Sequence, residues 1–180
     1  MGRPKQLIAV DGRSLIRHAV ESAIDGGCDP VIVVVGAEAE RVGREIRELR
    51  ARVVVNPSWS TGLASSIRRG MSEIEELKAD VEAVVLMGSD QPRISSAVIR
   101  RLLRAYRERE DRTLTMAACD YGDTLGSPAV FGRECFDRLG GLAGDRGAQL
   151  LLREGPDRVI RVPWPDGALD VDRPDDLENT

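Results

Sequence analysis

The sequence predicts an α/β fold in which a mostly parallel sheet carries helices on both faces, giving three layers. Short apolar runs alternate along the chain with segments of helical periodicity, which is the pattern of βαβ units. The runs are rich in β-branched residues, which is typical of strands covered on both faces of a sheet. The chain has 180 residues, which is the length of one domain, so we expect a single domain over residues 1–180.

The predicted strands are the apolar runs themselves, several of which end at glycine or proline signals. Their residues are Val31–Val35, 53–55, 83–87, 113–118, 129–131 and 158–162. The predicted helices lie between them, where apolar residues recur at spacings of three and four. They follow Ser14 and cover 39–49, 63–77 and 98–106. The pair Asp11-Gly12 predicts a turn before the first helix.

Composition excludes several classes of partner. The chain has 26 basic and 30 acidic residues and no dense basic tract, so no nucleic-acid partner is expected. It has no apolar run of the roughly 20 residues that a membrane span needs, and its first residues lack the apolar stretch of a signal peptide. We therefore expect a cytoplasmic protein with no membrane partner. Cys28, Cys119 and Cys135 form no C-x-x-C pair and are expected to be reduced thiols in or near the core.

In parallel sheets, ligands bind beyond the carboxyl ends of the strands, so the residues that follow each run are candidates for a site. Asp90 follows the run 83–87 in the sequence Gly88-Ser89-Asp90-Gln91-Pro92. A carboxylate there is well placed to hold magnesium, which takes one or two carboxylates and fills its other positions with phosphate oxygens and water. The alternative is that Asp90 only starts a turn before Pro92.

A second candidate is the loop 56–66, which is rich in small residues and leads into a predicted helix. Small residues allow close approach of a ligand, and a helix N-terminus favours anions. The alternative is an ordinary capped helix with Trp59 packed on the loop. A third candidate is Asp170 with Asp172, whose side chains point the same way if the segment is extended. The alternative there is a short strand before a helix.

Two single residues also bear on the chemistry. His18, the only histidine, falls in the predicted helix after Ser14 and is expected to be a surface or packing residue, which leaves no Ser-His-Asp or Cys-His arrangement. Lys5 is one of only two lysines, whereas 24 residues are arginine. A lysine in an N-terminal loop of such a chain is a candidate for a compact ammonium that contacts phosphate.

Motifs spread over essentially the whole chain resemble those of MobA-like NTP transferases, with molybdenum cofactor cytidylyltransferases as the most similar branch. Each motif is moderately specific, and their order and spacing together carry the resemblance. The motifs are Met1-Gly2-Arg3-Pro4-Lys5-Gln6-Leu7, Asp11-Gly12, Asn56-Pro-x-Trp59-x-x-Gly62-x-x-x-Ser66, Asp90-Gln91-Pro92, Gly126-Ser127-Pro128, Gly144-Asp145-Arg146-Gly147-Ala148 and Asp170-Val171-Asp172-x-Pro174-x-Asp176.

The resemblance implies a GT-A-like Rossmann domain that transfers a nucleotidyl group from an NTP and releases pyrophosphate, with Mg²⁺ as cofactor. The Gly-Asp-Arg-Gly sequence at 144–147 is more similar to the cytidylyltransferase branch, so CTP is expected before GTP. The implied acceptor is a molybdopterin-type small molecule, and the implied protein partner is a molybdoenzyme or its chaperone. The alternatives are another small nucleotidyltransferase with a sugar phosphate acceptor, or a non-catalytic nucleotide-binding partner in molybdoenzyme maturation.

The resemblance also implies roles for single residues. It makes Lys5 a catalytic phosphate ligand, Asp90 the magnesium ligand and Asp172 a second acid near the metal. The nucleotide is expected at Gly2, Arg3, Lys5, Gly62 and Ser66, and the acceptor at Gly126, Pro128 and Asp145.

The chain departs from the family pattern at its start. The family begins with a strand and a loop of the form L-A-A-G-x-S-x-R-M-G-x-x-K, and this chain starts at the Met of that motif. The family's first strand is central in the sheet and its loop amides cradle the phosphates. We therefore expect a sheet with unpaired central edges and weak NTP binding by the chain as written.

Overall fold

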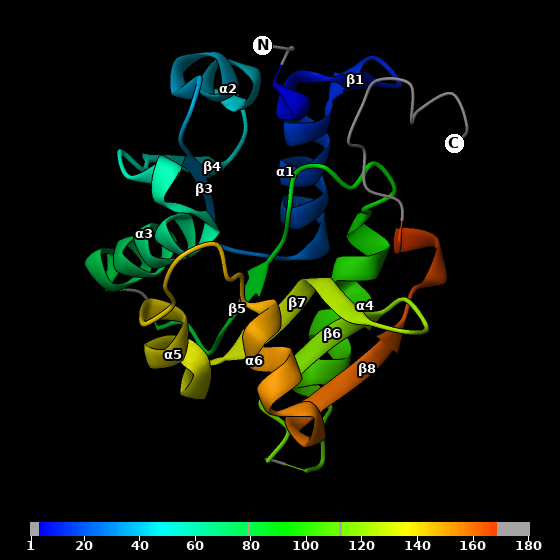
Figure 1. Ribbon diagram of the computed structural model, residues 1–180. Helices are drawn as coiled ribbons and strands as arrows, with labels where there is room; N and C mark the ends of the chain where they lie inside the picture. Colours follow the sequence, from blue (N-terminus) through cyan, green and yellow to red (C-terminus); the bar gives the residue numbers. More distant parts are fainter. Residues whose placement is uncertain (1–3, 79, 112, 169–180) are drawn as a thin grey trace.

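The computed structural model describes residues 4–78, 80–111 and 113–168. Its first part holds the short 3₁₀ helix η1 (Lys5–Leu7), the hairpin β1 (Ala9–Val10) and β2 (Arg13–Ser14), and α1 (Leu15–Gly26) (Figure 1). The remaining elements are β3 (Val31–Val35), α2 (Ala39–Ile46), β4 (Ala51–Val55), η2 (Trp59–Thr61), α3 (Leu63–Leu77), β5 (Ala83–Leu86), α4 (Ser96–Arg107), β6 (Met116–Asp120), β7 (Leu125–Gly132), η3 (Arg133–Cys135), α5 (Phe136–Gly140), α6 (Gln149–Glu154), η4 (Pro156–Arg158), β8 (Val159–Pro163) and η5 (Pro165–Ala168).

The α/β fold class is confirmed, but the larger sheet is mixed and not mostly parallel as the sequence predicted. Apart from the β1–β2 hairpin, β3 pairs with β4 in parallel, and a four-stranded sheet has the order β5-β7-β6-β8. β6 and β8 are parallel, whereas β7 is antiparallel to both of its neighbours. A short turn joins β6 to β7, and such a turn can only connect antiparallel strands.

The described strands leave an opening in the sheet between β3 and β5. β3 pairs only with β4, and β5 pairs only with β7, so each has one edge without a ladder partner among the described residues. Val31, Ile32 and Val34 of β3 are half-buried, although their run predicts cover on both faces. The expectation of unpaired central edges agrees with this arrangement.

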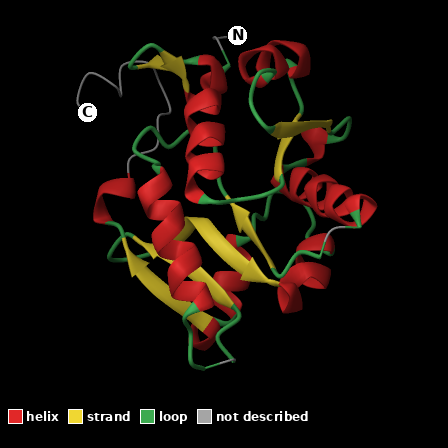
Figure 2. Ribbon diagram, turned by 180° about the vertical axis from the view of Figure 1, so that it is seen from behind, coloured by secondary structure: helices red, strands yellow, loops and turns green. Residues whose placement is uncertain are grey.

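Helices cover both faces of the larger sheet (Figure 2). On one face α3, α5 and α6 pack on β5, β6 and β7 around Phe131 and Met116. On the other face α4 packs through Ile99 and Leu102, and Ala19 of α1 joins the same core. α1 also turns Ile16 and Val20 toward β3 and α2, in a separate core that includes Leu7. α1 therefore packs on β3 and α2 with one side, and with another on α4, which covers the larger sheet.

A buried carboxylate anchors α3 to β4. The side chain of Glu73 on α3 is only 2% exposed, and it forms ion pairs with Arg52 of β4 and, at 2.9 Å, with Arg69 one helical turn before it. A buried carboxylate needs such partners because leaving it unpaired is costly. The anchor fixes the helix whose first turn carries two of the predicted nucleotide-binding residues.

The cysteines are free thiols, as the sequence predicts. Cys119 and Cys135 are buried and Cys28 is half-buried. Burial raises the pKa of Cys119 to about 12, so this thiol is protonated at neutral pH and packs as a small apolar side chain. Among the helices of the described ranges, none has both the length and the apolar composition for crossing a membrane.

Candidate functional site

The segment between β5 and α4 carries Asp90 and runs up beside α1 toward the end of that helix where η1 lies (Figure 1). Asp90 is half-buried. A Cβ atom placed on Gly88 would lie 2.6 Å from Asp90 Oδ1, so the carboxylate lies directly over the Gly88 backbone. Residue 88 must therefore lack a side chain if Asp90 is to keep this position.

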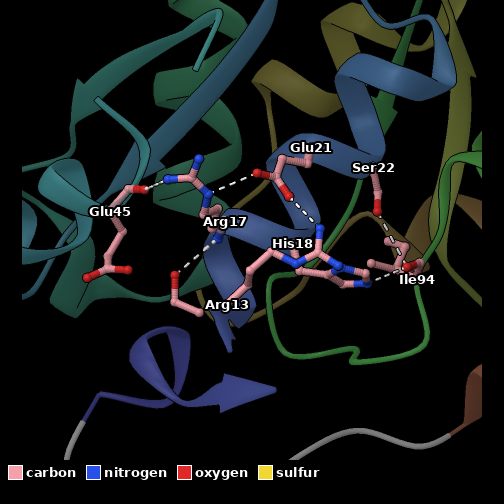
Figure 3. A network of polar contacts seen from close by, with 8 residues as sticks. Arg13, Arg17, His18, Glu21, Ser22, Glu45 and Ile94 are labelled. Atoms are coloured by element: carbon pink, nitrogen blue, oxygen red, sulfur yellow. Dashed lines mark hydrogen bonds and ion pairs between the residues drawn. The ribbon is translucent and has the colours of Figure 1, made fainter. Parts of the chain in front are cut away.

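α1 holds one side of this loop. The Ile94 carbonyl lies 2.7 Å from His18 Nε2 and accepts a hydrogen bond of 3.4 Å from Ser22 Oγ (Figure 3). His18 and Ser22 are four residues apart, so they lie on the same face of the helix. His18 was expected to be a surface or packing residue, and its contact with the loop that carries Asp90 gives it a more specific structural role. The sequence offers no signal for a partner 76 residues away.

β7 and the end of β6 hold the other side of the loop. The Gly88 amide donates to Ser127 Oγ at 3.2 Å. The side-chain amide of Gln91 donates to the Tyr121 hydroxyl at 3.1 Å and lies 3.5 Å from the Gly167 carbonyl. These contacts bring the predicted metal ligand Asp90 close to the predicted acceptor segment 126–128, which the sequence placed in separate motifs.

The loop between β4 and α3 is organised by Asn56, which is 3% exposed. Its Nδ2 donates to Ser65 Oγ at 2.8 Å and to Ser66 Oγ at 3.0 Å, and its Oδ1 accepts from the Ser58 amide at 2.9 Å. The predicted nucleotide residue Ser66 is therefore held by a side chain from the preceding strand end. Asn56 belongs to the motif quoted above, but the sequence alone did not assign it a role.

The first turn of α3 is covered by a distant loop. The Ala64 amide donates to the Gly144 carbonyl at 3.2 Å. Gly62 has a φ of 105°, and a Cβ atom there would lie 2.3 Å from Asp145 Oδ1. Gly62 and Asp145, predicted on the nucleotide and acceptor sides, thus lie in contact. The Ala64 amide at this end of α3 thus has a protein acceptor, and no side chain of residue 62 caps the helix.

Two further contacts complete this region. Trp59 packs over Gly36, where a Cβ atom would lie 2.4 Å from the Trp59 Cβ, and it remains 50% exposed. Gln149 Nε2 donates to the Leu125 carbonyl at 3.1 Å, directly before Gly126. The loop after α5 thus contacts the start of α3, and the first residue of α6 contacts the start of β7, so this part of the chain connects both predicted sides of the site.

Lys5 lies in η1 and is exposed. Leu7 is buried against α1, and the Leu15 amide donates to the Ile8 carbonyl at 2.9 Å, so this segment is tied to the helix whose His18 contacts the Asp90 loop. The predicted residues Gly2, Arg3, Asp170 and Asp172 lie outside the described residues.

Asp90 is thus the one predicted metal ligand that the structure describes. Within residues 4–78, 80–111 and 113–168, no three His, Cys, Asp or Glu side chains gather as a metal-binding group. A single half-buried carboxylate suits magnesium, which often binds protein through one or two carboxylates and takes its other ligands from phosphate and water. The described donor set therefore fits a cation that arrives with a nucleotide.

Replacing Asn56 tests how far this loop depends on it. Asn56→Ala removes three hydrogen bonds and leaves the buried Ser65 hydroxyl without its Asn56 partner, so we expect the free energy of unfolding to fall by about 2–3 kcal/mol. Urea denaturation of the natural sequence and of Asn56→Ala measures this difference in the free energy of unfolding. A loss below about 0.5 kcal/mol, the size of an ordinary surface effect, would contradict the assigned role.

Comparison with known proteins shows where the chain belongs. Nicotine blue oxidoreductase of Paenarthrobacter nicotinovorans is 32% identical over 160 residues, which are 87% of this chain and 76% of that protein. The structure of Rv0371c from Mycobacterium tuberculosis H37Rv is similar with a TM-score of 0.79 at 28% identity, over 99% of this chain and 89% of that one. Rv0371c has also been solved in complex with manganese.

A nucleotidyl transferase from Methanothermobacter thermautotroptrophicus shares the fold, with a TM-score of 0.77 at 22% identity over 97% of this chain and 82% of that one. Residues 1–159 match the sequence model of the MobA-like NTP transferase domain. The chain therefore belongs to the MobA-like NTP transferase family.

Proposed function

We propose that this protein transfers a CMP group, in preference to GMP, from an NTP to a phosphate of a molybdopterin-type acceptor and releases pyrophosphate. The observation that supports this most is the family match over residues 1–159 together with Asp90 on the loop after β5. The same loop contacts the 126–128 segment, which is the proposed acceptor side. A molybdoenzyme or its chaperone is the proposed protein partner.

The reaction needs little covalent chemistry from the protein. A phosphate oxygen of the acceptor attacks the α-phosphorus of the NTP in line, the new P–O bond forms, and the bond to the pyrophosphate oxygen breaks. Catalysis is then mainly positioning and neutralisation of charge. We propose that Gly62 and Ser66 contact the nucleotide. The acceptor would lie against Gly126, Pro128 and Asp145. Gly2 and Arg3 would contact the phosphates beside Lys5, whose ammonium offsets charge on the leaving group.

Asp90 is the residue that would hold Mg²⁺, and Asp172 is proposed as a second acid, with Asp170 able to share its role. A bound magnesium ion would neutralise charge on the phosphates. Two observations support this assignment: Rv0371c binds manganese in its crystal structure, and Gly167 lies beside Gln91. The segment that leads to Asp170 and Asp172 therefore starts next to the Asp90 loop.

Asp90→Asn is the direct test of the proposed function. The purified protein is given CTP or GTP, Mg²⁺ and molybdopterin-type acceptor, and pyrophosphate release is measured. We expect transfer with CTP by the natural sequence and a loss of at least about a hundredfold in Asp90→Asn, because an amide is a poor ligand for a hard cation. Gly88→Ala, which pushes the carboxylate away without removing it, should show a smaller loss.

The matched control is Asp123→Asn, the same change in the exposed turn between β6 and β7. It should leave transfer unchanged. Near-normal transfer by Asp90→Asn would overturn the assignment of the metal ligand. CTP binding without transfer to any phosphate acceptor would favour the non-catalytic alternative, and transfer to a sugar phosphate alone would favour the other small nucleotidyltransferases.

The role of Lys5 is tested by binding. We expect Lys5→Gln to weaken CTP binding about tenfold, because a phosphate loses one close positive charge. The control is Lys78→Gln, a change of the only other lysine, which lies at the C-terminal end of α3. Calorimetric titration of CTP into the three proteins gives the dissociation constants. Equal affinities in all three would show that Lys5 does not contact the nucleotide.

A second candidate function is the reduction of nicotine blue, which the 32% identity to nicotine blue oxidoreductase favours. Its test is the bleaching of nicotine blue by this protein with NADH or NADPH as the hydride donor. Bleaching that depends on the protein, with no pyrophosphate release from CTP in the transfer assay, would replace the proposed transferase function. Under the proposed function, we expect no bleaching above the rate without protein.

A further inference from the structure

We infer that Tyr121 is a positioning residue whose hydroxyl fixes the Asp90 loop against the acceptor segment 126–128. This inference rests on the proposed function, since it concerns the alignment of the same two sides of the site. Tyr121 lies just after β6, in the turn that leads to β7, and belongs to none of the motifs quoted from the sequence.

The hydroxyl joins two separate segments at once. It accepts a hydrogen bond of 3.1 Å from Gln91 Nε2 and donates one to the Ser127 carbonyl. A phenol has one O–H donor and can accept as well, so both bonds form together. Gln91 directly follows Asp90, and Ser127 lies between Gly126 and Pro128. One oxygen atom therefore connects the proposed metal ligand's loop with the proposed acceptor strand.

The ring of Tyr121 is itself held in place. A Cβ atom on Gly126 would lie 2.7 Å from Tyr121 Cε2, so the ring lies flush against the β7 backbone at Gly126. The Trp164 ring packs near it, with 5.9 Å between the ring centroids. The Tyr121 amide donates to the Thr124 carbonyl at 3.0 Å, which fixes the backbone of the turn. These contacts position the hydroxyl. They also explain why residue 126 is a glycine independently of any ligand, because a side chain there would collide with the Tyr121 ring.

Gln91 explains why the loop depends on this hydroxyl. The residue is 8% exposed, and a buried side-chain amide needs hydrogen-bond partners. The Tyr121 hydroxyl is the nearer of the two acceptors of its Nε2 group, since the Gly167 carbonyl lies 3.5 Å away. Without the Tyr121 hydroxyl, the Gln91 side-chain amide turns toward water to find a hydrogen-bond acceptor. This turn moves the adjacent Asp90. A displacement of about 1 Å at a reacting centre can cost about a hundredfold in rate.

The other tyrosine of the chain provides a matched control. Tyr106 on α4 is buried, whereas Tyr121 is half-buried, and the Tyr106 hydroxyl lies beside Gly132, at the opposite end of β7 from Ser127. Its ring packs under the Arg109 guanidinium, 3.7 Å from the ring centroid. Tyr106→Phe thus removes a tyrosine hydroxyl that also lies against β7, but at the end of the strand away from the Asp90 loop. A purely structural role for tyrosine hydroxyls predicts similar effects of both changes.

The first experiment needs no nucleotide. Hydrogen exchange measured by mass spectrometry follows the amides of residues 86–95 in the natural sequence, Tyr121→Phe and Tyr106→Phe. The amides of Gly88 and Ile94 report directly, because they donate to Ser127 Oγ and the Gln91 carbonyl. We expect exchange about tenfold faster in Tyr121→Phe alone, as local opening becomes easier by about 1.4 kcal/mol. Unchanged exchange, or equal acceleration in both variants, would overturn the inference.

The second experiment measures the gain in CTP affinity on adding Mg²⁺. We expect Tyr121→Phe to lose at least about fivefold of this gain, with CTP affinity in the absence of metal unchanged, because only Asp90 moves. Tyr106→Phe should keep the full gain. If the natural sequence shows the gain and Tyr121→Phe keeps all of it, the inference fails while the proposed function stands. If the natural sequence shows no gain, the proposed function fails and this inference fails with it.

A second variant covers the case in which Tyr121→Phe does not fold. Gln91→Leu breaks the same hydrogen bond from the other side and should lose the same part of the Mg²⁺-dependent gain. Where all variants fold, the double variant should lose no more than either single one, because both changes remove one interaction. Additive losses would show that the two residues act separately and would overturn the inference.

Discussion

The packing of α1 between the β3–β4 pair and α4, the helix that covers the larger sheet, is the constraint on which the rest of the structure depends. The described strands on either side of the opening, β3 and β5, share no ladder hydrogen bonds. Ile16 and Val20 pack with β3 and α2, while Ala19 lies in the core that α4 forms with the larger sheet. The apolar contacts of this helix therefore hold the two sheets together, as hydrogen bonds between strands do in a continuous sheet. Its polar contacts, through His18 and Ser22, extend the same support to the loop after β5.

That loop carries Asp90, and its position results from supports on opposite sides. The Ile94 carbonyl is held by α1, and Gly88 and Gln91 are held by Ser127 and Tyr121. Loops that place functional groups need such supports, because a connecting segment has few contacts of its own. The loop at 144–145 plays a comparable part at the first turn of α3, where it meets Gly62. Both predicted sides of the site thus depend on contacts between segments that are distant in sequence.

Local patterns were sufficient for some of this architecture. The unbroken run of β-branched residues at Val31–Val35 became β3 with the same bounds, and the helical spacing over 63–77 became α3. α5 and α6 were not predicted, because helices of five and six residues are too short to show a period. Asp90 was found because it follows a strand. Tyr121 and Gln91 were not paired, since their hydrogen bond spans 30 residues and neither residue type points to the other. Asp170 and Asp172 lie outside the described residues, so their assignment still rests on the resemblance.

The central claim is that the Asp90 loop binds a divalent cation together with the nucleotide. Its most direct test is nuclear magnetic resonance of the isotope-labelled protein with CTP and increasing Mn²⁺, a paramagnetic ion that broadens the signals of nearby amides. The account predicts that the signals of residues 88–91 broaden first, that Ser127 follows, and that broadening is much weaker without CTP. Broadening centred on residues 144–147 or on the exposed acids of α2, with the signals of 88–91 unaffected, would contradict it.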